Sequence, residues 1–389
     1  MFDFTEEELK NLHAIYTASE IAQQPTTWLK TLKILESHHD EIKDFISQVL
    51  NQEDFDIILT GAGTSEFVGN SLFPYLNQLS GYKCKSYGTT DIVQAPQSYL
   101  SSNKPTLLIS FGRSGNSPES IGAVDIANTV NENVKHICIT CNKEGKLANI
   151  QQDSHKYYVL NLPDETHDQS FAMTSSFTNM YLACLLCFEY NSQMLKNITT
   201  LISSCQKLID HDFMIAKKIV DEFDFHRIVY LGAECLKGVA QESALKMLEL
   251  TAGNVCVTHD TPLGFRHGPK SVIDDTTLIV MYVSDDDYTY QYELDLIKEM
   301  SMQRKGNKIL VVCNKNRDEL KAYVDYYYTF KNDNIKSIYL GFGYIIVAQL
   351  LALYKSLRYG ITPDNPCPSG EVNRVVKGVT LYQYEKRGA

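Results

Sequence analysis

The sequence lacks an excess of positive charge. Its 389 residues include 36 Lys and Arg against 47 Asp and Glu, which gives a formal net charge of -11. A nucleic acid or an anionic membrane needs clustered positive charge on its protein partner, so this balance disfavours both. It is compatible with a small phosphorylated molecule, because backbone amides and a few local cations can hold a phosphate group.

The sequence also lacks the pattern of a secretory signal and a long apolar run. It begins MFDFTEEELK, which is acidic where a signal peptide has a basic start and an apolar core. The longest apolar run, Leu340–Tyr354, contains Gln349 and is shorter than the roughly 20 residues that span a bilayer. We therefore expect no membrane segment and interpret this run as a buried helix.

The sequence has ten cysteines, and two pairs of them have the CxxC spacing that often marks a metal site. Neither pair has the surroundings that such a site needs. Cys138 and Cys141 lie in the strand-like run HICITC, where residues three apart point to opposite faces and cannot bind one ion. Cys184 and Cys187 lie in the helix-like apolar run MYLACLLCF. Both pairs are typical of thiols packed in a core, which predicts neither a metal nor a cofactor. Reduced thiols also indicate a cytoplasmic location.

What the sequence does contain is an internal repeat. Three pairs of segments match each other: 57–63 with 228–234, 106–109 with 277–280, and 141–143 with 313–315. The offset in residue number is nearly the same for all three pairs, and each segment includes or closes a short apolar run. A fixed period of this kind indicates one structural unit that is present twice.

Within each copy, short apolar runs alternate with longer amphipathic stretches. In the first copy, helices are expected from about Ser65, Pro118 and Leu147. This alternation is typical of a parallel sheet covered on both faces, so we predict an α/β fold with two flavodoxin-like or Rossmann-like αβα sandwiches. The expected parts are a helical arm packed on the first copy (1–50), a first domain (51–190), a helical connection (191–213), a second domain (214–360) and a C-terminal tail (361–389).

The loop TGAGTS at 60–65 follows a predicted strand and opens a helix. Ligands of parallel α/β sheets bind beyond the carboxyl ends of the strands, where this loop lies. Its glycines allow a tight turn, and the hydroxyl groups of Thr64 and Ser65 add donors to the amides at the helix start. The loop predicts a phosphate cradle, with a simple strand-to-helix connection as the alternative.

The loop GRSGNS at 112–117 is a more specific signal. Ser117 suits the N-cap of the next helix, and Pro118 suits its first position. Ser114, Ser117 and the surrounding amides would then face an anion, with Arg113 nearby. The alternative is a capped helix with solvated serines.

At the matching position the second copy reads YVSDDD at 282–287. Three successive carboxylates would repel a phosphate group. We therefore expect the two copies to have divided their tasks, with one anion site per chain.

The second copy carries candidate acid–base groups. In the helical run ESALKMLE, the spacings put Glu242, Lys246 and Glu249 on one face. The loop TPLGFRHGPK at 261–270 presents His267 between glycines and prolines. Histidine exchanges protons near neutral pH and a carboxylate can act as a base, so these groups suit proton transfer in a sugar phosphate.

Each of these candidates has an alternative. The helical face alone is equally typical of an ion-pair ladder at the surface. His259, next to Asp260, competes for the role of the acid–base histidine, and we interpret it as structural.

The two loops and the duplicated α/β unit resemble the sugar isomerase (SIS) domain over nearly the whole chain. EIAQQP, ESALKMLEL, FRHGP and VNRVVKGVTLY are similar to segments in the isomerase half of glucosamine-6-phosphate synthase. FGRSGNSPES and DETHDQSFAMTSSFTNM are similar to the AgaS-type branch of galactosamine-6-phosphate deaminases and tagatose-6-phosphate ketose/aldose isomerases. Two motifs depart from the family. Gly112 replaces the first serine of the phosphate loop, and the tail motif PRNLAK reads VNRVVK here.

The resemblance implies roles for six binding residues. The phosphate group would be bound by four residues with hydroxyl groups: Thr64, Ser65, Ser114 and Ser117. The sugar pocket would be lined by Arg113 and Thr174.

The resemblance also implies four catalytic residues. Glu249 matches the base that enolises the sugar, and Lys246 is a supporting lysine on the same helix. His267 matches the ring-opening histidine, which the partner subunit supplies, so a homodimer or larger assembly with shared active sites is implied. Lys377 matches the lysine that engages the open-chain carbonyl, which would make the tail part of the active site.

The implied activity is that of an aldose–ketose isomerase that needs neither metal nor cofactor. The expected reaction converts galactosamine 6-phosphate to tagatose 6-phosphate and ammonia, since no amidotransferase domain accompanies the SIS region. Tagatose-6-phosphate isomerisation without deamination and fructosamine-phosphate deglycation are the enzymatic alternatives. A non-catalytic sugar-phosphate sensor is disfavoured, because the sequence has no helix-turn-helix segment and the acid–base set would be superfluous.

Overall fold

The computed structural model describes residues 1–150, 153–332, 335–376 and 378–385. Its chain divides into two compact units, each built around one copy of the repeat. The first-repeat unit comprises Thr26–Asp168, Ser175–Tyr190 and Ser369–Ala389. The second-repeat unit comprises Met1–Pro25, Gln169–Thr174 and Asn191–Pro368.

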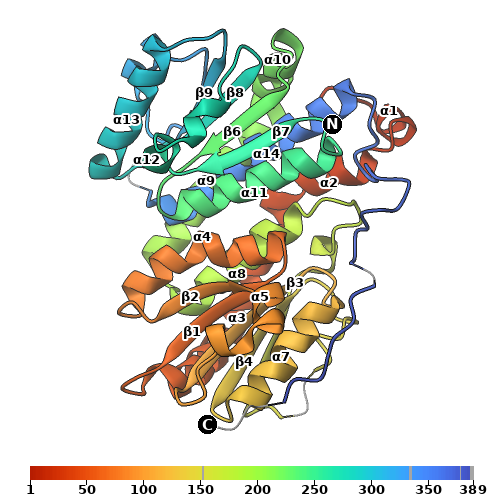
Figure 1. The fold of residues 1–389 in the computed structure, drawn as a ribbon, viewed down its shortest axis with the longest axis vertical. Coiled ribbons are helices and arrows are strands. Elements are labelled where there is room, and N and C mark those ends of the chain that lie inside the picture. The colour runs from red at the N-terminus through yellow and green to blue at the C-terminus, as the bar shows by residue number, and fades with distance from the viewer. Residues whose placement is uncertain (151–152, 333–334, 377, 386–389) are drawn as a thin grey trace. The chain divides into compact units, whose positions relative to one another are not determined.

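The first-repeat unit is built on a parallel sheet of five strands in the order β2-β1-β3-β4-β5 (Figure 1). The strands are β1 (Asp56–Gly61), β2 (Cys84–Gly88), β3 (Thr106–Gly112), β4 (Val134–Thr140) and β5 (Tyr157–Asn161). Every residue of β1 and β3 is buried, as expected for a parallel sheet with both faces covered.

Helices complete the layers of this unit. They are α3 (Gln24–Leu50), α4 (Thr64–Leu79), α5 (Thr89–Gln94), α6 (Pro96–Tyr99), α7 (Pro118–Val130) and α8 (Ser175–Phe188), with a short 3-10 helix η1 (Asp164–Thr166). Helices α5 and α7 share a core cluster with Ile58 and Leu108 of the sheet. Helix α8 packs against α4 and is fully buried over residues 175–187, so the thiols of Cys184 and Cys187 lie in the core as predicted.

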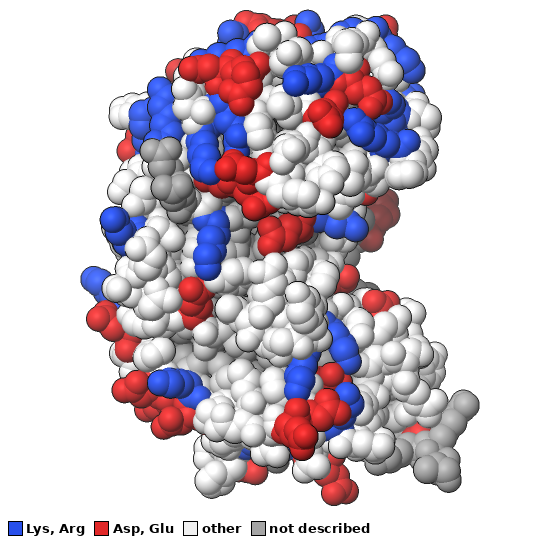
Figure 2. Space-filling view, turned by 90° about the vertical axis from the view of Figure 1, so that its left-hand side faces the viewer, with Lys and Arg blue, Asp and Glu red and all other residues white. Residues whose placement is uncertain are grey.

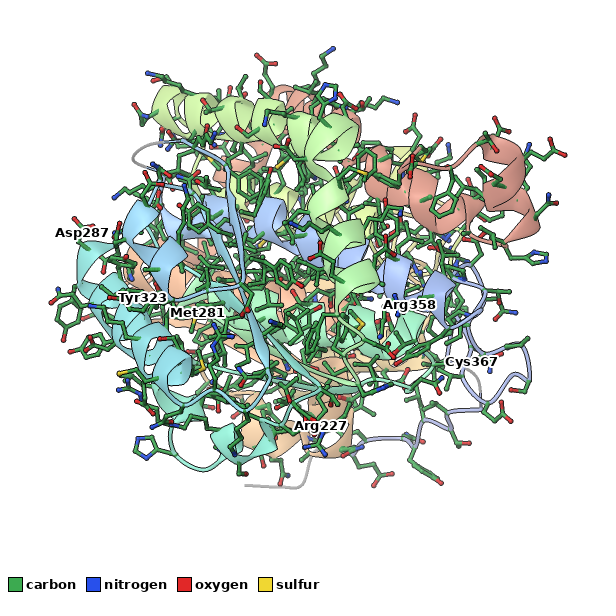
Figure 3. The ribbon with its side chains drawn as sticks, turned by 90° about the horizontal axis from the view of Figure 1, so that it is seen from above. Arg227, Met281, Asp287, Tyr323, Arg358 and Cys367 are labelled. Carbon is green, nitrogen blue, oxygen red and sulfur yellow. The ribbon has the colours of Figure 1, made fainter. Side chains whose placement is uncertain are left out.

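The second-repeat unit repeats this topology, with a parallel sheet in the order β10-β9-β8-β6-β7. The strands are β6 (Arg227–Leu231), β7 (Cys256–Asp260), β8 (Thr277–Tyr282), β9 (Lys308–Cys313) and β10 (Tyr326–Thr329). Figure 3 shows Met281 of β8 among interior side chains, whereas Asp287, just beyond this strand, lies at the periphery. The prediction of two αβα units with parallel sheets is therefore confirmed.

The helices of this unit include the first two of the chain. They are α1 (Glu6–Asn11), α2 (Ile15–Ala22), α9 (Ser192–Lys207), α10 (Met214–Glu222), α11 (Cys235–Leu250), α12 (Pro262–Phe265), α13 (Asp287–Met302) and α14 (Ser337–Arg358). A π-helix η2 (Leu208–Asp212) and two 3-10 helices, η3 (Pro269–Val272) and η4 (Asp318–Ala322), join them. Thr17 of α2 is hydrogen-bonded to Asp364 at 2.8 Å. The segment Met1–Pro25 thus packs in this unit, and not on the first copy as we expected.

Helix α14 corrects the length argument for the apolar run. It continues past both ends of Leu340–Tyr354 to reach 22 residues, and by length and composition it could cross a membrane. Its 18-residue apolar window is entirely buried, because α11, α10, α9 and α2 pack around it. The run is therefore a buried helix as predicted, although its length did not establish this.

On the face that Figure 2 shows, the described Lys and Arg side chains are interspersed with Asp and Glu. This face therefore lacks the continuous basic stripe by which a protein tracks a nucleic-acid backbone.

The glycine loop after the first strand has the same backbone in both units. Gly61 and Gly232 end or follow the first strand of their sheets, and a Cβ atom on either would lie 2.4 Å from backbone atoms of the following helix. Gly63 has φ 56° and ψ -126°, and Glu234 adopts the same conformation with φ 53° and ψ -126°. The close approach at Gly61 and Gly232 is thus required sterically by the strand-to-helix turn in each copy.

This steric requirement predicts matched losses of stability in the two units. Gly61→Ala and Gly232→Ala should each lower the free energy of unfolding by about 3 kcal/mol or more, because the helix start must move away from the new methyl group. Thermal and denaturant unfolding of the single variants measures the loss.

Gly81→Ala is the control for these two variants. A Cβ atom at Gly81 meets nothing within 4 Å, so the substitution carries only the cost of a positive φ, about 1 kcal/mol. Equal losses of stability in all three variants would contradict the steric argument.

Candidate active site

The predicted phosphate cradle lies in the first-repeat unit, at the carboxyl ends of β1 and β3. These strands are hydrogen-bonded neighbours, and the chain leaves them toward opposite sides of the sheet, which is where ligands of such sheets bind. Thr64 and Ser65 lie in the first turn of α4, and the amide end of a helix attracts anions. The structure thus brings the loop at 60–65 next to the loop at 112–117.

The second loop of the cradle is held by the segment that follows β4. Ser117 is the N-cap of α7 with Pro118 at its start, as predicted, and the Ser117 hydroxyl lies 2.6 Å from the Ser120 hydroxyl. Asn142 Nδ2 donates to the Ser114 carbonyl at 2.9 Å, and the Leu147 amide donates to the Gly115 carbonyl at 2.9 Å.

These contacts correct the helix expected from about Leu147. The described residues 143–149 form turns, and two of their amide groups bond to the cradle loop while others bond within the segment. Lys146, for example, donates its backbone N–H to Asn116 Oδ1 at 3.0 Å.

Arg113 connects the cradle loop to the C-terminal tail within the first-repeat unit. Its side chain is nearly buried, and its guanidinium group donates to the Arg374 carbonyl at 2.8 Å. Arg374 in turn donates Nε to the Asp168 carbonyl at 3.0 Å. Burial, followed by the charges of Arg374 and Arg113, lowers the pKa of the adjacent His167. Lys377, three positions beyond Arg374, lies outside the described residues.

Thr174 belongs to the second-repeat unit and is fully buried. Its segment, Gln169–Thr174, is fastened by Glu20 of α2, whose carboxylate accepts from the backbone amide and the hydroxyl group of Ser170. The sequence did not predict this contact between Glu20 and Ser170. Glu20 lies in the quoted EIAQQP motif, but no local signal shows that its partner is Ser170, in a distant part of the sequence.

The predicted acid–base face lies on α11 of the second-repeat unit. Lys246 Nζ lies 2.5 Å from Glu249 Oε2 and 3.4 Å from Glu242 Oε1. The side chains of Lys246 and Glu242 are 0 % exposed, whereas that of Glu249 is 22 % exposed. The alternative of a surface ladder is therefore wrong: this ion triad is buried, and only Glu249 keeps access to a ligand.

His267 lies on an exposed loop whose ends are fixed. Thr261 caps α12 by accepting from the Gly264 amide at 3.0 Å. After His267, Gly268 turns the chain with φ 118°. Arg266 pairs with Glu299 of α13 at 2.9 Å, and Lys270 pairs with the same carboxylate. His267 is therefore exposed to solvent, while ion pairs on both sides of it fix the loop to α13.

His259 differs from His267 in its surroundings. It lies half-buried on β7, and burial is the main cause that lowers its pKa. An imidazole that is neutral at physiological pH suits the structural role that we expected for it.

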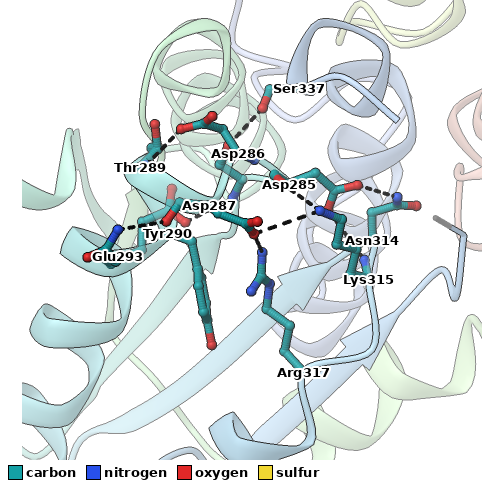
Figure 4. A network of polar contacts seen from close by, with 12 residues as sticks. Asp285, Asp286, Asp287, Thr289, Tyr290, Glu293, Asn314, Lys315, Arg317 and Ser337 are labelled. Carbon is teal, nitrogen blue, oxygen red and sulfur yellow. Dashed lines mark hydrogen bonds and ion pairs between the residues drawn. The ribbon is translucent and has the colours of Figure 1, made fainter. Parts of the chain in front are cut away.

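The three carboxylates of the acidic loop in the second-repeat unit each have hydrogen-bond or ion-pair partners in the same unit (Figure 4). Asp285 is buried and accepts from Asn314 Nδ2 at 2.6 Å, and burial raises its pKa. Asp286 is the N-cap of α13, where hydrogen bonds from Thr289 lower its pKa. Asp287 is exposed and pairs with Arg317 at 3.4 Å. These acids occupy the place that the serine-rich loop holds in the first copy.

Metal ligands do not cluster in the described parts of the chain, where no group of three or more His, Cys, Asp or Glu side chains could hold an ion.

The predicted site residues that the structure describes fall into two sets, one in each unit. The first-repeat unit holds Thr64, Ser65, Arg113, Ser114 and Ser117. The second-repeat unit holds Thr174, Lys246, Glu249 and His267.

Comparison with known proteins assigns the chain to a family. The model of the SIS domain matches residues 50–190 and again residues 223–357. The chain belongs to the SIS domain family. Among SIS proteins, the D-galactosamine-6-phosphate deaminase AgaS of Shewanella sp. (strain ANA-3) is 43 % identical over 98 % of this chain and 95 % of its own length.

Other SIS relatives agree with this match. The protein of the same name from Escherichia coli O157:H7 is 39 % identical over 95 % of this chain and 96 % of its own. The crystal structure of tagatose-6-phosphate ketose/aldose isomerase from Escherichia coli aligns with a TM-score of 0.87 at 38 % identity, covering 95 % of this chain and 97 % of that one. The C-terminal domain of glucosamine-fructose-6-phosphate aminotransferase from Francisella tularensis shares the fold, with a TM-score of 0.73 at 19 % identity over 90 % of this chain and 98 % of its own.

The buried triad predicts a large cost for removing its cation. Lys246→Met should lower the free energy of unfolding by about 3–5 kcal/mol, because it leaves two carboxylates facing each other in the interior. The double variant Glu242→Gln/Lys246→Met should recover much of that loss, since it also removes the buried negative charge. Denaturant unfolding of both variants measures the difference.

Lys217→Met is the matched control for this experiment. Lys217 pairs with Asp221 at 2.8 Å on the exposed face of α10, so its loss should leave stability within experimental error. A Lys246→Met variant as stable as this control would show that the triad is not a coupled buried network.

Proposed function

We propose that this protein is a galactosamine-6-phosphate deaminase, which converts galactosamine 6-phosphate and water to tagatose 6-phosphate and ammonia. The observation that carries the proposal is the near full-length identity with deaminases of this name, at 43 % over 98 % of the chain. The buried lysine beside a partly exposed Glu249 supports it, because a base for proton transfer needs both a fixed position and access to the sugar.

The proposed steps need only acid–base groups. His267 opens the pyranose ring, which leaves an aldehyde at C1 and an amine at C2. Glu249 removes the proton from C2 and returns it to C1, while O1 gains a proton and the C2 nitrogen loses one, so that C1 becomes an alcohol and C2 an imine. Water then hydrolyses the imine to the ketone of tagatose 6-phosphate and releases ammonia, with no net oxidation.

The remaining predicted residues hold the substrate in this proposal. Phosphate is bound at the cradle by the two helix starts and by the residues Thr64, Ser65, Ser114 and Ser117. Arg113 and Thr174 line the sugar pocket. Lys246 orients Glu249, and Lys377 of the tail engages the open-chain carbonyl.

One other activity has a specific observation in its favour. The structural relative from Escherichia coli is named a tagatose-6-phosphate ketose/aldose isomerase, and the same proton transfer on a sugar without nitrogen would yield an aldose. Deglycation of a fructosamine phosphate and ligand sensing without catalysis remain alternatives. The homodimer with shared sites, the cytoplasmic location and the domain limits stay predictions.

The assignment of the base is tested by Glu249→Gln. We expect this variant to lose ammonia release by at least about 1,000-fold while binding of galactosamine 6-phosphate changes little, since the amide keeps the shape of the side chain but cannot take a proton. A coupled ammonia assay measures the rate, and calorimetry measures binding. Glu222→Gln, at an exposed position on α10, is the control and should keep full activity. Turnover retained in Glu249→Gln would refute the assignment.

The substrate is tested with a panel that contains galactosamine, glucosamine, tagatose and fructosamine phosphates. Ammonia release from galactosamine 6-phosphate alone supports the deaminase. Conversion of tagatose 6-phosphate without ammonia supports the isomerase. Solvent deuterium should enter C1 of the ketose that a deaminase forms, or C2 of the aldose that an isomerase forms from tagatose 6-phosphate, and a passive sensor can cause neither.

A further inference from the structure

The second-repeat unit contains a cavity that lies outside the residues assigned to the reaction. It has a volume of about 330 Å³ and is formed by the loops after β6 and β7 together with the first turns of α13. Strands β6 and β8 are neighbours, and the chain passes from β6 to β7 on one side of the sheet and from β8 to β9 on the other. The cavity therefore lies at the same ligand-binding position of its sheet that the phosphate cradle occupies in the first-repeat unit.

A buried carboxyl group lines this cavity. Glu293 is 0 % exposed, and its Oε2 accepts from the Ser284 amide at 2.9 Å. Its Oε1 has no hydrogen-bond partner among the described residues, although a buried polar atom without a partner is costly. Burial raises the pKa of Glu293 to about 8. A group that is kept buried and half unpaired at a cavity wall is explained if a ligand completes its bonding.

The other walls of the cavity are aromatic and apolar. The rings of Tyr288 and Tyr292 lie edge to face with centroids 5.3 Å apart, and both side chains are partly exposed to solvent. Leu263 and Ala233 add apolar surface. None of the described lining residues is basic, so no side chain of the cavity would neutralise the charge of a phosphate group.

These walls select a cation. Carboxylates and aromatic rings both bind ammonium groups, through charge-assisted hydrogen bonds and attraction to ring faces, and Glu293, Tyr288 and Tyr292 all line this cavity. An ammonium group beside Glu293 would favour its ionised form and so offset the burial that raises its pKa. The nearby guanidinium group of Arg317 is already engaged, because it pairs with Asp287 and stacks on the ring of Tyr290 with its Cζ atom 3.4 Å from the centroid.

We propose that this cavity binds a small organic amine, with its ammonium group on Glu293 Oε1 and its hydrocarbon part against Tyr288, Tyr292 and Leu263. The two copies of the repeat would then bind ligands of opposite charge at equivalent positions. This site is separate from the reacting groups, and its existence does not depend on which sugar phosphate the protein uses.

The test is calorimetric titration of the full chain with cyclohexylamine and, separately, with cyclohexanol, a neutral molecule of the same size. We expect one amine per chain and at least tenfold weaker binding of the alcohol. Glu293→Gln should weaken amine binding at least tenfold. This variant should fold, since glutamine keeps the acceptor for the Ser284 amide. Equal binding of the two ligands, or amine binding unchanged in Glu293→Gln, would overturn the proposal.

Two further variants place the amine. Ala233→Leu fills the cavity from the end of β6 and should abolish amine binding, which keeps the proposal testable if Glu293→Gln fails to fold. Glu249→Gln removes a carboxylate of the proposed reaction and should leave amine binding unchanged. Loss of amine binding in Glu249→Gln, with Ala233→Leu unaffected, would assign the amine to the reaction site and overturn the proposal.

Discussion

Burial of the two parallel sheets on both faces is the constraint on which the rest of the structure depends. A strand without a solvated face has no position for an uncompensated charge along its length, and β1, β3 and β8 are buried at every residue. Chemistry is then confined to the points where strands end and helices begin. The cradle loops, the acidic loop and the carboxyl-lined cavity all lie at such points.

The same backbone serves two different chemical environments. Gly63 and Glu234 share one unusual conformation, and Gly61 and Gly232 share one close approach to a helix, so the strand-to-helix turn has kept its shape in both copies. Around this turn the first copy supplies glycines and hydroxyl groups, whereas the second supplies carboxylates and tyrosines. The duplication therefore preserved a geometry and changed the charge that this geometry presents.

Local signals in the sequence predicted the parts of the site whose contacts are local. Ser117 before Pro118 marked a helix start that the structure contains, and the constant offset between the repeated segments located both sheets. The burial of Lys246 was not predictable, because it depends on the packing of α14, a much later segment of the chain, against α11. The helix expected from about Leu147 is absent over the described residues 147–150 for a similar reason, since the Leu147 and Lys146 amides bond to a loop that the local sequence does not reveal.

Internal compensation of charge explains how an acidic protein can offer a site to an anion. Many of its carboxylates form ion pairs with neighbouring cations: Asp287 pairs with Arg317, Asp325 with Arg304, and Asp224 with Lys355. Fields of paired charges fall off quickly in salt water, so the net charge of -11 has little effect at a distance beyond about 8–10 Å. At the proposed cradle the amides and hydroxyl groups would then determine what binds. The relevant electrostatic quantity is therefore the local arrangement at each strand end, which is why the proposed sites in the two copies can differ in the charge of their ligands.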